Sequence, residues 1–208
     1  MNKEITHIPP LRLSILTPLF DFAMSLIGLG KGFKKDLVAK MGVKDGQSII
    51  DIGCGTGVLA VEAKKMFPRS KVVGIDPDKP ALEIAKARAK RENVEVDFTF
   101  GSAKKLPLKT ETFHVAVSTL AFHHMPAAVK KKAAKEAFRV LKRGGKFCLF
   151  DFKPRKRVFW NFWTFFEWEH ARDNYEGKLS IFLKNAGFRR VKSIMSKYGI
   201  FELLMAEK

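Results

Sequence analysis

The sequence is poor in cysteine and contains no long uncharged apolar segment. Its two cysteines, Cys54 and Cys148, lie far apart, which fits neither a disulfide framework nor a paired metal site. No window of about 18 apolar residues is free of charge, since the richest candidate, residues 11–29, is interrupted by Arg12 and Asp21. The first residues also lack the compact apolar region and the cleavage site of a signal peptide. We therefore expect a reduced cytoplasmic protein without a spanning helix or a metal.

Acidic residues are scarce relative to basic ones. The chain has 21 Asp and Glu against 39 Lys and Arg, a net charge of +18 at pH 7, and its densest basic stretch is residues 130–146. Two interpretations stay open. The charge is either an ordinary solvated surface or an attraction to an anionic partner, such as a phospholipid surface, nucleic acid or an acidic substrate.

Helical and strand patterns alternate along the 208 residues. We expect helices at residues 17–28, 33–41, 58–65, 80–91, 127–142 and 176–185. We expect strands at residues 48–52, 71–75, 94–100, 113–120, 146–152, 190–196 and 200–206. This alternation predicts an α/β fold with a mostly parallel sheet, because parallel neighbours need crossover connections. The last two strands flank Lys197-Tyr198-Gly199, which predicts an antiparallel hairpin at one edge.

The most informative segment is residues 49–57, Ile-Ile-Asp-Ile-Gly-Cys-Gly-Thr-Gly. A strand, a glycine turn and a helix in this order let a ligand approach bare backbone at a helix N-terminus. The dinucleotide fingerprint G-x-G-x-x-G is shaped around a pyrophosphate, whereas this turn is G-x-G-x-G after Asp51. Such a turn suits a ligand without a phosphate. Here the sequence resembles the class I S-adenosylmethionine-dependent methyltransferases, whose first motif it matches residue for residue.

The resemblance covers about residues 45–155 and is greatest to the small-molecule and lipid branch, which includes quinone and phospholipid N-methyltransferases. It implies a Rossmann-like, seven-stranded, mostly parallel sheet in the order 3-2-1-4-5-7-6, with strand 7 antiparallel and helices on both faces. It also implies S-adenosylmethionine as cofactor and S-adenosylhomocysteine as product. We expect one domain over residues 1–208. Its parts would be a helical cap (1–44), a cofactor-binding core (45–155), an aromatic lid insertion (156–178), and the last helix with the edge hairpin (179–208).

The expected cofactor site lies beyond the carboxyl ends of the parallel strands, where open sheets of this kind bind ligands. Asp51 closes the first strand, and its carboxylate can accept hydrogen bonds from turn amides or hold the cofactor's ammonium group through water. Asp76 follows the second strand, 19 residues beyond Gly57, the interval at which an acidic side chain reaches ribose hydroxyls; the resemblance implies the same role. The candidate cofactor-binding residues are Asp51, Gly53, Cys54, Gly55, Gly57, Asp76, Pro77, Ser102, Ala103, Ser118 and Leu120.

Two positions depart from the family's pattern. Ser102 stands where relatives usually have an acidic residue that receives the adenine amino group, although a hydroxyl can still accept a hydrogen bond. Phe20 precedes Asp21 where many relatives have a tyrosine that touches the cofactor carboxylate. We expect that contact to be missing or to be made elsewhere.

Two adjacent histidines, His123 and His124, follow the fourth strand. An isolated pair of this kind usually belongs to a satisfied polar turn, and it lacks the further ligands of a metal site. In the methyltransferase family that the sequence resembles, the segment after the fourth strand lines the cleft between cofactor and substrate. Either histidine is a candidate catalytic proton acceptor. A base is optional, because the sulfonium charge already activates the methyl group and alignment can supply much of the rate.

An aromatic run at residues 158–168 contains all three tryptophans of the chain. It is either a helix that covers the core or an apolar lid that rests on a membrane, with the basic residues 155–157 meeting anionic headgroups. The candidate substrate-binding residues are Phe20, Trp160, Trp163, His170, Arg172 and Tyr175.

We therefore expect methyl transfer from S-adenosylmethionine to a small, amphipathic or lipid-like acceptor, by a cytoplasmic enzyme that can contact an anionic membrane from its inner face. Two alternatives stay open. The positive charge suits an RNA or protein methyltransferase. However, the fourth strand does not end in the Asn/Asp-Pro-Pro-Tyr/Phe sequence with which amino-methylating nucleic-acid enzymes hold a flipped base. The other alternative is a protein that binds the cofactor without catalysis.

Overall fold

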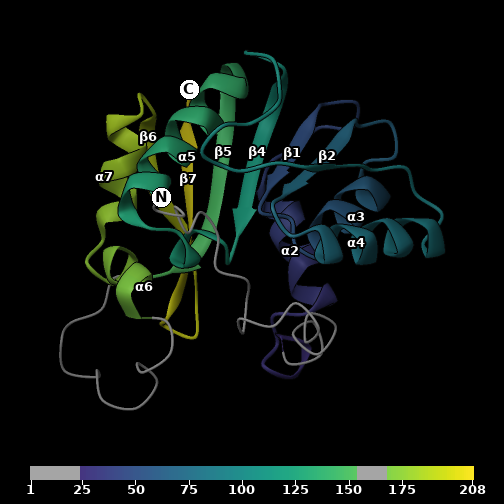
Figure 1. The fold of residues 1–208 in the computed structure, drawn as a ribbon, viewed down its shortest axis with the longest axis horizontal. Coiled ribbons are helices and arrows are strands. Elements are labelled where there is room, and N and C mark those ends of the chain that lie inside the picture. The colour runs from purple at the N-terminus through teal and green to yellow at the C-terminus, as the bar shows by residue number, and fades with distance from the viewer. Residues whose placement is uncertain (1–23, 154–167) are drawn as a thin grey trace, which may run out of the picture.

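The computed structural model describes residues 24–153 and 168–208. Its elements in chain order are α2 (Lys31–Lys40), β1 (Ile49–Ile52), α3 (Val58–Met66), β2 (Val72–Asp76), α4 (Lys79–Arg91), β3 (Asp97–Phe100), β4 (Phe113–Thr119), the 3-10 helix η3 (Phe122–His124), α5 (Ala127–Val140), β5 (Leu141–Phe152), α6 (Trp168–Tyr175), α7 (Lys178–Asn185), β6 (Arg189–Lys197) and β7 (Phe201–Glu207). Figure 1 shows them as one twisted sheet with helices in front of it and behind it.

The seven strands form one sheet in the order β3-β2-β1-β4-β5-β7-β6. The pairs among β1 to β5 are parallel, whereas β7 runs antiparallel to both β5 and β6. The predicted fold and strand order are therefore confirmed. Because the order reverses between β1 and β4, a crevice forms at their carboxyl ends.

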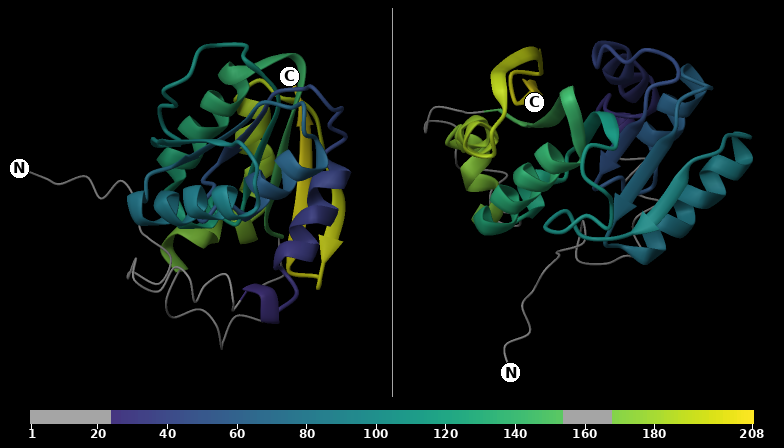
Figure 2. Two further views of the ribbon diagram at one scale, coloured as in Figure 1. Left: turned by 90° about the vertical axis from the view of Figure 1, so that its right-hand side faces the viewer. Right: turned by 90° about the horizontal axis from the view of Figure 1, so that it is seen from above.

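Alternate side chains of the central strands enter two separate cores, because successive residues of a strand point to opposite faces. In β4, Val115 and Val117 pack with α2 and α3, while Ala116 lies in the core formed with α5 and α7. Figure 2 shows these helix groups on the two sides of the sheet. Every residue of β1 and β2 is buried, which explains why these strands are apolar apart from Gly74 and the two aspartates, Asp51 and Asp76.

Two predicted helix boundaries are wrong. The expected helix at 176–185 begins only at Lys178, because Gly177 has a left-handed conformation with φ of 73° that separates α7 from α6. The expected helix at 127–142 ends at Val140, since Leu141 already pairs with Phe113 as the first residue of β5. The register of β5 then shifts, and Gly144 and Gly145 lie inside this strand, which was expected to begin only at residue 146.

The third strand is shorter than expected, beginning at Asp97 instead of residue 94. Asn93 has φ of 52° and the amide of Val94 donates to Ala89 O, so these residues complete the end of α4. Of the expected helix at 17–28, the part up to residue 23 lies outside the described residues. Residues 24–26 are helical and the turn that follows reaches Gly28.

Within the described ranges, none of the helices combines the length and the apolar character that crossing a bilayer requires.

Candidate functional site

The glycine turn after β1 forms the floor of a pocket at the carboxyl ends of β1, β2 and β4. Gly53, Gly55 and Gly57 have φ of 75°, 51° and 74°, the left-handed region that side chains disfavour. A Cβ at Gly55 would meet no atom within 4 Å, so this backbone is open to a ligand. A Cβ at Gly57 would lie 2.7 Å from the Cβ of Ala85, so glycine here also allows α3 and α4 to approach each other.

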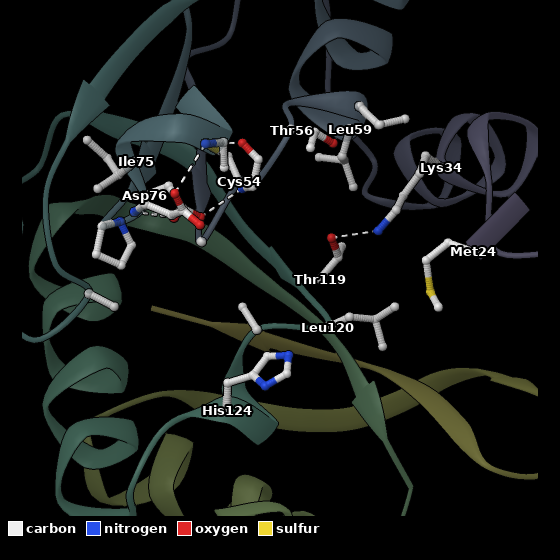
Figure 3. A pocket seen from close by; sticks show the side chains of 18 of the residues that line it. Met24, Lys34, Cys54, Thr56, Leu59, Ile75, Asp76, Thr119, Leu120 and His124 are labelled. Carbon is white, nitrogen blue, oxygen red and sulfur yellow. Dashed lines mark hydrogen bonds between the residues drawn. The ribbon is translucent and has the colours of Figure 1, made fainter. Parts of the chain in front are cut away.

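Asp76 ties this turn to the end of β2. Its Oδ2 accepts a hydrogen bond from the amide of Gly55 at 2.8 Å, and its Oδ1 accepts one from the amide of Asp78 at 2.8 Å (Figure 3). Asp78 in turn caps α4 by accepting from the amide of Ala81 at 3.2 Å. The carboxylate of Asp76 is therefore held in one orientation at the pocket wall, where its remaining lone pairs can accept from a diol.

Asp51 is 1% exposed, and neither oxygen of its carboxylate has a hydrogen-bond partner among the described residues. The expected hydrogen bonds from the turn amides are not formed, because Gly53 and Cys54 donate to Ile75 O instead. Burial raises the pKa of Asp51 to about 7, a rise that the charge of Lys34 opposes and the charge of Asp76 reinforces. A buried carboxylate without a donor is costly, and a cationic group beside it would remove that cost.

Lys34 is a residue of this site that sequence reasoning missed. It comes from α2, lines the pocket, and donates from Nζ to Thr119 Oγ1 at 2.7 Å. In Figure 3 its side chain reaches across the pocket from the helix toward the end of β4. The signal that could have revealed it is the missing tyrosine at position 20, which leaves a polar contact to be supplied by another N-terminal residue.

Of the two cofactor-binding residues predicted at the end of β4, Leu120 lines the pocket and Ser118 lies in the core. Ser118 is fully buried and donates from Oγ to Ile52 O at 2.7 Å, so it joins β4 to β1 and does not line the pocket. Leu120 lines the pocket in a left-handed conformation with φ of 54°. Such a conformation is strained for leucine, and strain of this kind is common at ligand sites.

Only one of the two predicted catalytic histidines lines the pocket. His124 lines the pocket. His123 is 6% exposed, does not line the pocket, and places Nδ1 3.0 Å from Asp151 Oδ1. Their rings lie next to each other with centroids 3.9 Å apart. By position, only His124 of this pair is available to an acceptor in the pocket.

The pocket encloses about 370 Å³, which lies within the usual range for small-molecule sites. The predicted residues that line it are Gly53, Cys54, Gly55, Asp76, Pro77, Ser102, Ala103, Leu120 and His124. The predicted residues behind its wall are Asp51, Gly57, Ser118 and His123. Apolar side chains that sequence reasoning missed, Met24, Leu29, Met125 and Val129, also line it.

The predicted substrate residues are not brought together here. Phe20, Trp160 and Trp163 lie outside the described residues. His170, Arg172 and Tyr175 belong to α6 and do not line this pocket. Arg172 donates to Glu176 at 2.7 Å on the surface, and the ring of Tyr175 packs on Phe152 with centroids 5.3 Å apart.

Comparison with known proteins agrees with this geometry. A family model described as a methyltransferase domain matches residues 49–145. The chain is 32% identical over 136 residues to a demethylmenaquinone methyltransferase of Lactobacillus johnsonii, which covers 63% of this chain and 55% of that protein. It is 32% identical over 143 residues to a protein of the same name from Thermus thermophilus, covering 68% of this chain and 64% of that protein.

The match thus spans about three fifths of the length of these relatives. Among solved structures, a SAM-dependent methyltransferase from Aquifex aeolicus superimposes with a TM-score of 0.68 at 21% identity, over 84% of this chain and 88% of that chain. At this identity the likeness concerns the fold alone.

Proposed function

The chain belongs to the class I S-adenosylmethionine-dependent methyltransferases, and on that premise we propose that it methylates a small amphipathic acceptor of the quinone type. The observation that carries this proposal is one pocket with the open glycine turn, a lysine and apolar walls, next to a buried carboxylate, Asp51, that has no hydrogen-bond partner among the described residues. The curated relatives described above, which are named for a demethylmenaquinone, support the acceptor class.

Two charged groups, Lys34 on the pocket wall and Asp51 behind it, suit the cofactor's amino-acid part. An amino acid at neutral pH carries an ammonium group and a carboxylate. The carboxylate of Asp51 complements the first, and the ammonium group of Lys34 complements the second. We assign the ammonium to the region of Asp51 and the carboxylate to Lys34. Asp76 would accept from the ribose hydroxyls, and Ser102 would lie toward the adenine. When bound, S-adenosylmethionine supplies a methyl group already activated by the sulfonium charge.

The protein's own contribution to catalysis is then position and exclusion of water. Leu120 and His124, which follow β4, lie on the pocket wall beside the glycine turn. They would hold the acceptor in line with the methyl group, an arrangement that can supply much of the rate. His124 would also take up the proton that a hydroxyl or carbon acid loses. Met24, Leu29 and Met125 form apolar walls that suit a hydrocarbon substituent.

An exposed apolar patch beside the pocket suggests where a lipid-like acceptor arrives. Leu26 is 72% exposed, Ile27 50% and Tyr198 61%. Gly28 contacts Tyr198, which places these residues from distant parts of the chain together, next to the pocket residues Met24 and Leu29. Lys197 lies over the Tyr198 ring at 4.8 Å. Apolar side chains mixed with lysine fit peripheral contact with an anionic membrane.

Two experiments test the proposal in sequence. Calorimetry with S-adenosylhomocysteine tests the pocket, and we expect binding with one site per chain. Incubation with methyl-labelled cofactor then tests the acceptor, using demethylmenaquinol in anionic vesicles, total RNA and a protein extract. Label in the quinol fraction supports the proposal, whereas label in RNA or protein overturns the acceptor class. Binding without turnover in any fraction would favour a protein that binds the cofactor without catalysis.

The membrane contact has its own test. Flotation with anionic vesicles should retain the protein at low ionic strength and release it at high salt, because screening weakens the attraction to lysines. A Leu26→Ser/Ile27→Ser variant should float less. Ile181→Ser on α7, a residue about as exposed as Ile27 that does not line the pocket, should behave as wild type. Absence of flotation at low ionic strength would remove the membrane from the proposal and leave the pocket assignment intact.

A further inference from the structure

A buried polar cluster lies directly behind the pocket wall, and the proposed reaction does not use it. Its centre is Asp151, near the end of β5 and 1% exposed. The two oxygens of Asp151 face donors from two other elements. Oδ2 accepts from the amides of Phe122 at 3.0 Å and His123 at 3.3 Å, and Oδ1 accepts from Asn174 Nδ2 at 2.9 Å. Asp151 therefore joins η3, which carries the histidines, to α6.

The cluster continues to α5 through two side chains that are 0% exposed, Asn174 and Lys130. Lys130 donates from Nζ to Asn174 Oδ1 at 2.8 Å, and also to His170 O. Its Nζ lies 3.7 Å from Asp173 Oδ2. All three of these partners belong to α6, so Lys130 anchors that helix at several points. Because Asn174 both donates to Asp151 and accepts from Lys130, it links the two charges.

Electrostatics favour the ionised form of Asp151. Burial raises the pKa of this carboxyl, but the charge and hydrogen bond of His123, the amide of Phe152 and the charge of Lys130 outweigh burial, so its pKa lies below the ordinary value. An ionised carboxylate only accepts, so His123 carries a proton on Nδ1 in this pair. This fixes the His123 ring, and the adjacent ring of His124, 3.9 Å away, lies against it.

Burial of a lysine and an aspartate is costly and adds little stability compared with apolar packing. An arrangement that holds every hydrogen bond in one geometry does, however, specify where the connected elements lie. α6 is the helix that follows residues 154–167, and η3 places His124 at the pocket.

We propose that Lys130, Asn174 and Asp151 form a positioning relay that couples the location of α6 to the orientation of the pocket histidine His124. The coupling itself rests on the contacts above; its consequence for methyl transfer rests on the proposed function. A change in the position of α6 would thereby reach the pocket without any contact to the cofactor.

The test removes the hydrogen bonds that hold α6 and measures the effect on η3, at the other side of the cluster. Lys130→Met keeps the length of the side chain and removes its donors, and Asn174→Ser is a milder second variant should the first not fold. Lys132→Met, on the exposed side of the same helix, is the matched control. Hydrogen exchange of the Phe122 and His123 amides is measured in each variant, with the Val117 amide of β4 as internal reference.

We expect the two amides of η3 to exchange at least about tenfold faster in both relay variants, with Val117 and the control unchanged. Affinity for S-adenosylhomocysteine should stay within about threefold of wild type, because its proposed ligands are untouched. Where methyl transfer to demethylmenaquinol is measurable, kcat should fall while KM for the cofactor holds.

Equal acceleration of η3 and Val117 would mean that the cluster only stabilises the whole fold, and unchanged η3 amides in a folded variant would mean that no coupling exists. Either result overturns the proposal. If wild-type protein shows no methyl transfer or cofactor binding, the proposed function fails, but the exchange experiment still decides the coupling.

Discussion

Replacing Asp51 by asparagine tests two expected effects of this buried carboxylate: a loss of folding stability when it ionises, and a gain in cofactor affinity. The raised pKa of Asp51, about 7 against an ordinary 3.8, means that the folded protein holds a proton more tightly than the unfolded chain does. The contribution of Asp51 to stability is therefore greatest at low pH and falls as pH rises from about 4 to about 7. Asparagine cannot ionise, so the variant lacks this fall.

The pKa rise of about three units corresponds to about 4 kcal/mol at 1.36 kcal/mol per unit. Roughly a third of this cost is already present at pH 5 and nearly all of it at pH 8. The unfolding free energy of Asp51→Asn minus that of wild type should thus increase by about 2–3 kcal/mol between pH 5 and pH 8. Any loss caused by the unpaired amide of asparagine is the same at both pH values and cancels in this comparison.

Cofactor binding should show the opposite trend. The ammonium group of S-adenosylhomocysteine favours the ionised form of Asp51, so wild-type affinity should rise about tenfold from pH 6 to pH 8, as the ionised fraction does for a pKa near 7. In Asp51→Asn the affinity should be lower and nearly independent of pH.

Urea denaturation at pH 5, 6, 7 and 8 measures the first quantity, and calorimetry in the same buffers measures the second. A stability difference that stays constant with pH would refute the reasoning, because it would show that Asp51 does not titrate in this range. A pH-dependent stability with a pH-independent affinity would instead refute the assignment of the ammonium group to Asp51.

Three further substitutions test the pocket. Lys34→Met should weaken S-adenosylhomocysteine binding about tenfold in calorimetry through loss of a charge-assisted contact, whereas Lys35→Met, exposed on the same helix, should not. Asp76→Asn should weaken binding about 10- to 100-fold, and an unchanged dissociation constant would exclude Asp76 from the site. Gly57→Ala should lower the unfolding free energy by about 2–4 kcal/mol, because alanine is strained at a φ of 74° and its Cβ would lie only 2.7 Å from the Cβ of Ala85. A denaturation midpoint equal to wild type would contradict this.

The core of the fold was predictable because its signals are local. The glycine turn, the apolar strands and the helix after each strand occur in consecutive residues, and the parallel order follows from the crossovers between them. The errors lie where two local signals compete. Leu141 suits the end of a helix as well as the start of a strand, and only pairing with Phe113 decides in favour of β5.

The candidate site was predictable wherever a residue acts through its position in a motif. Asp76 and Gly55 follow directly from the strand, the turn and the spacing between them. The polar residues of α6 were predicted to bind substrate because they cluster in the sequence directly after the aromatic run. In the structure, Asn174 is buried in a hydrogen-bonded cluster, and no sequence pattern marks a partner that comes from another helix.

The sequence by itself determined the α/β architecture, the glycine turn and the acidic residue after the second strand, because each depends on residues close together in the chain. Only the tertiary structure decided which of two adjacent histidines lines the pocket, that no donor from the described residues reaches Asp51, and that Lys34 reaches Thr119, a residue 85 positions away. These outcomes depend on which side chains meet in space, and burial then sets how strongly their charges act on each other.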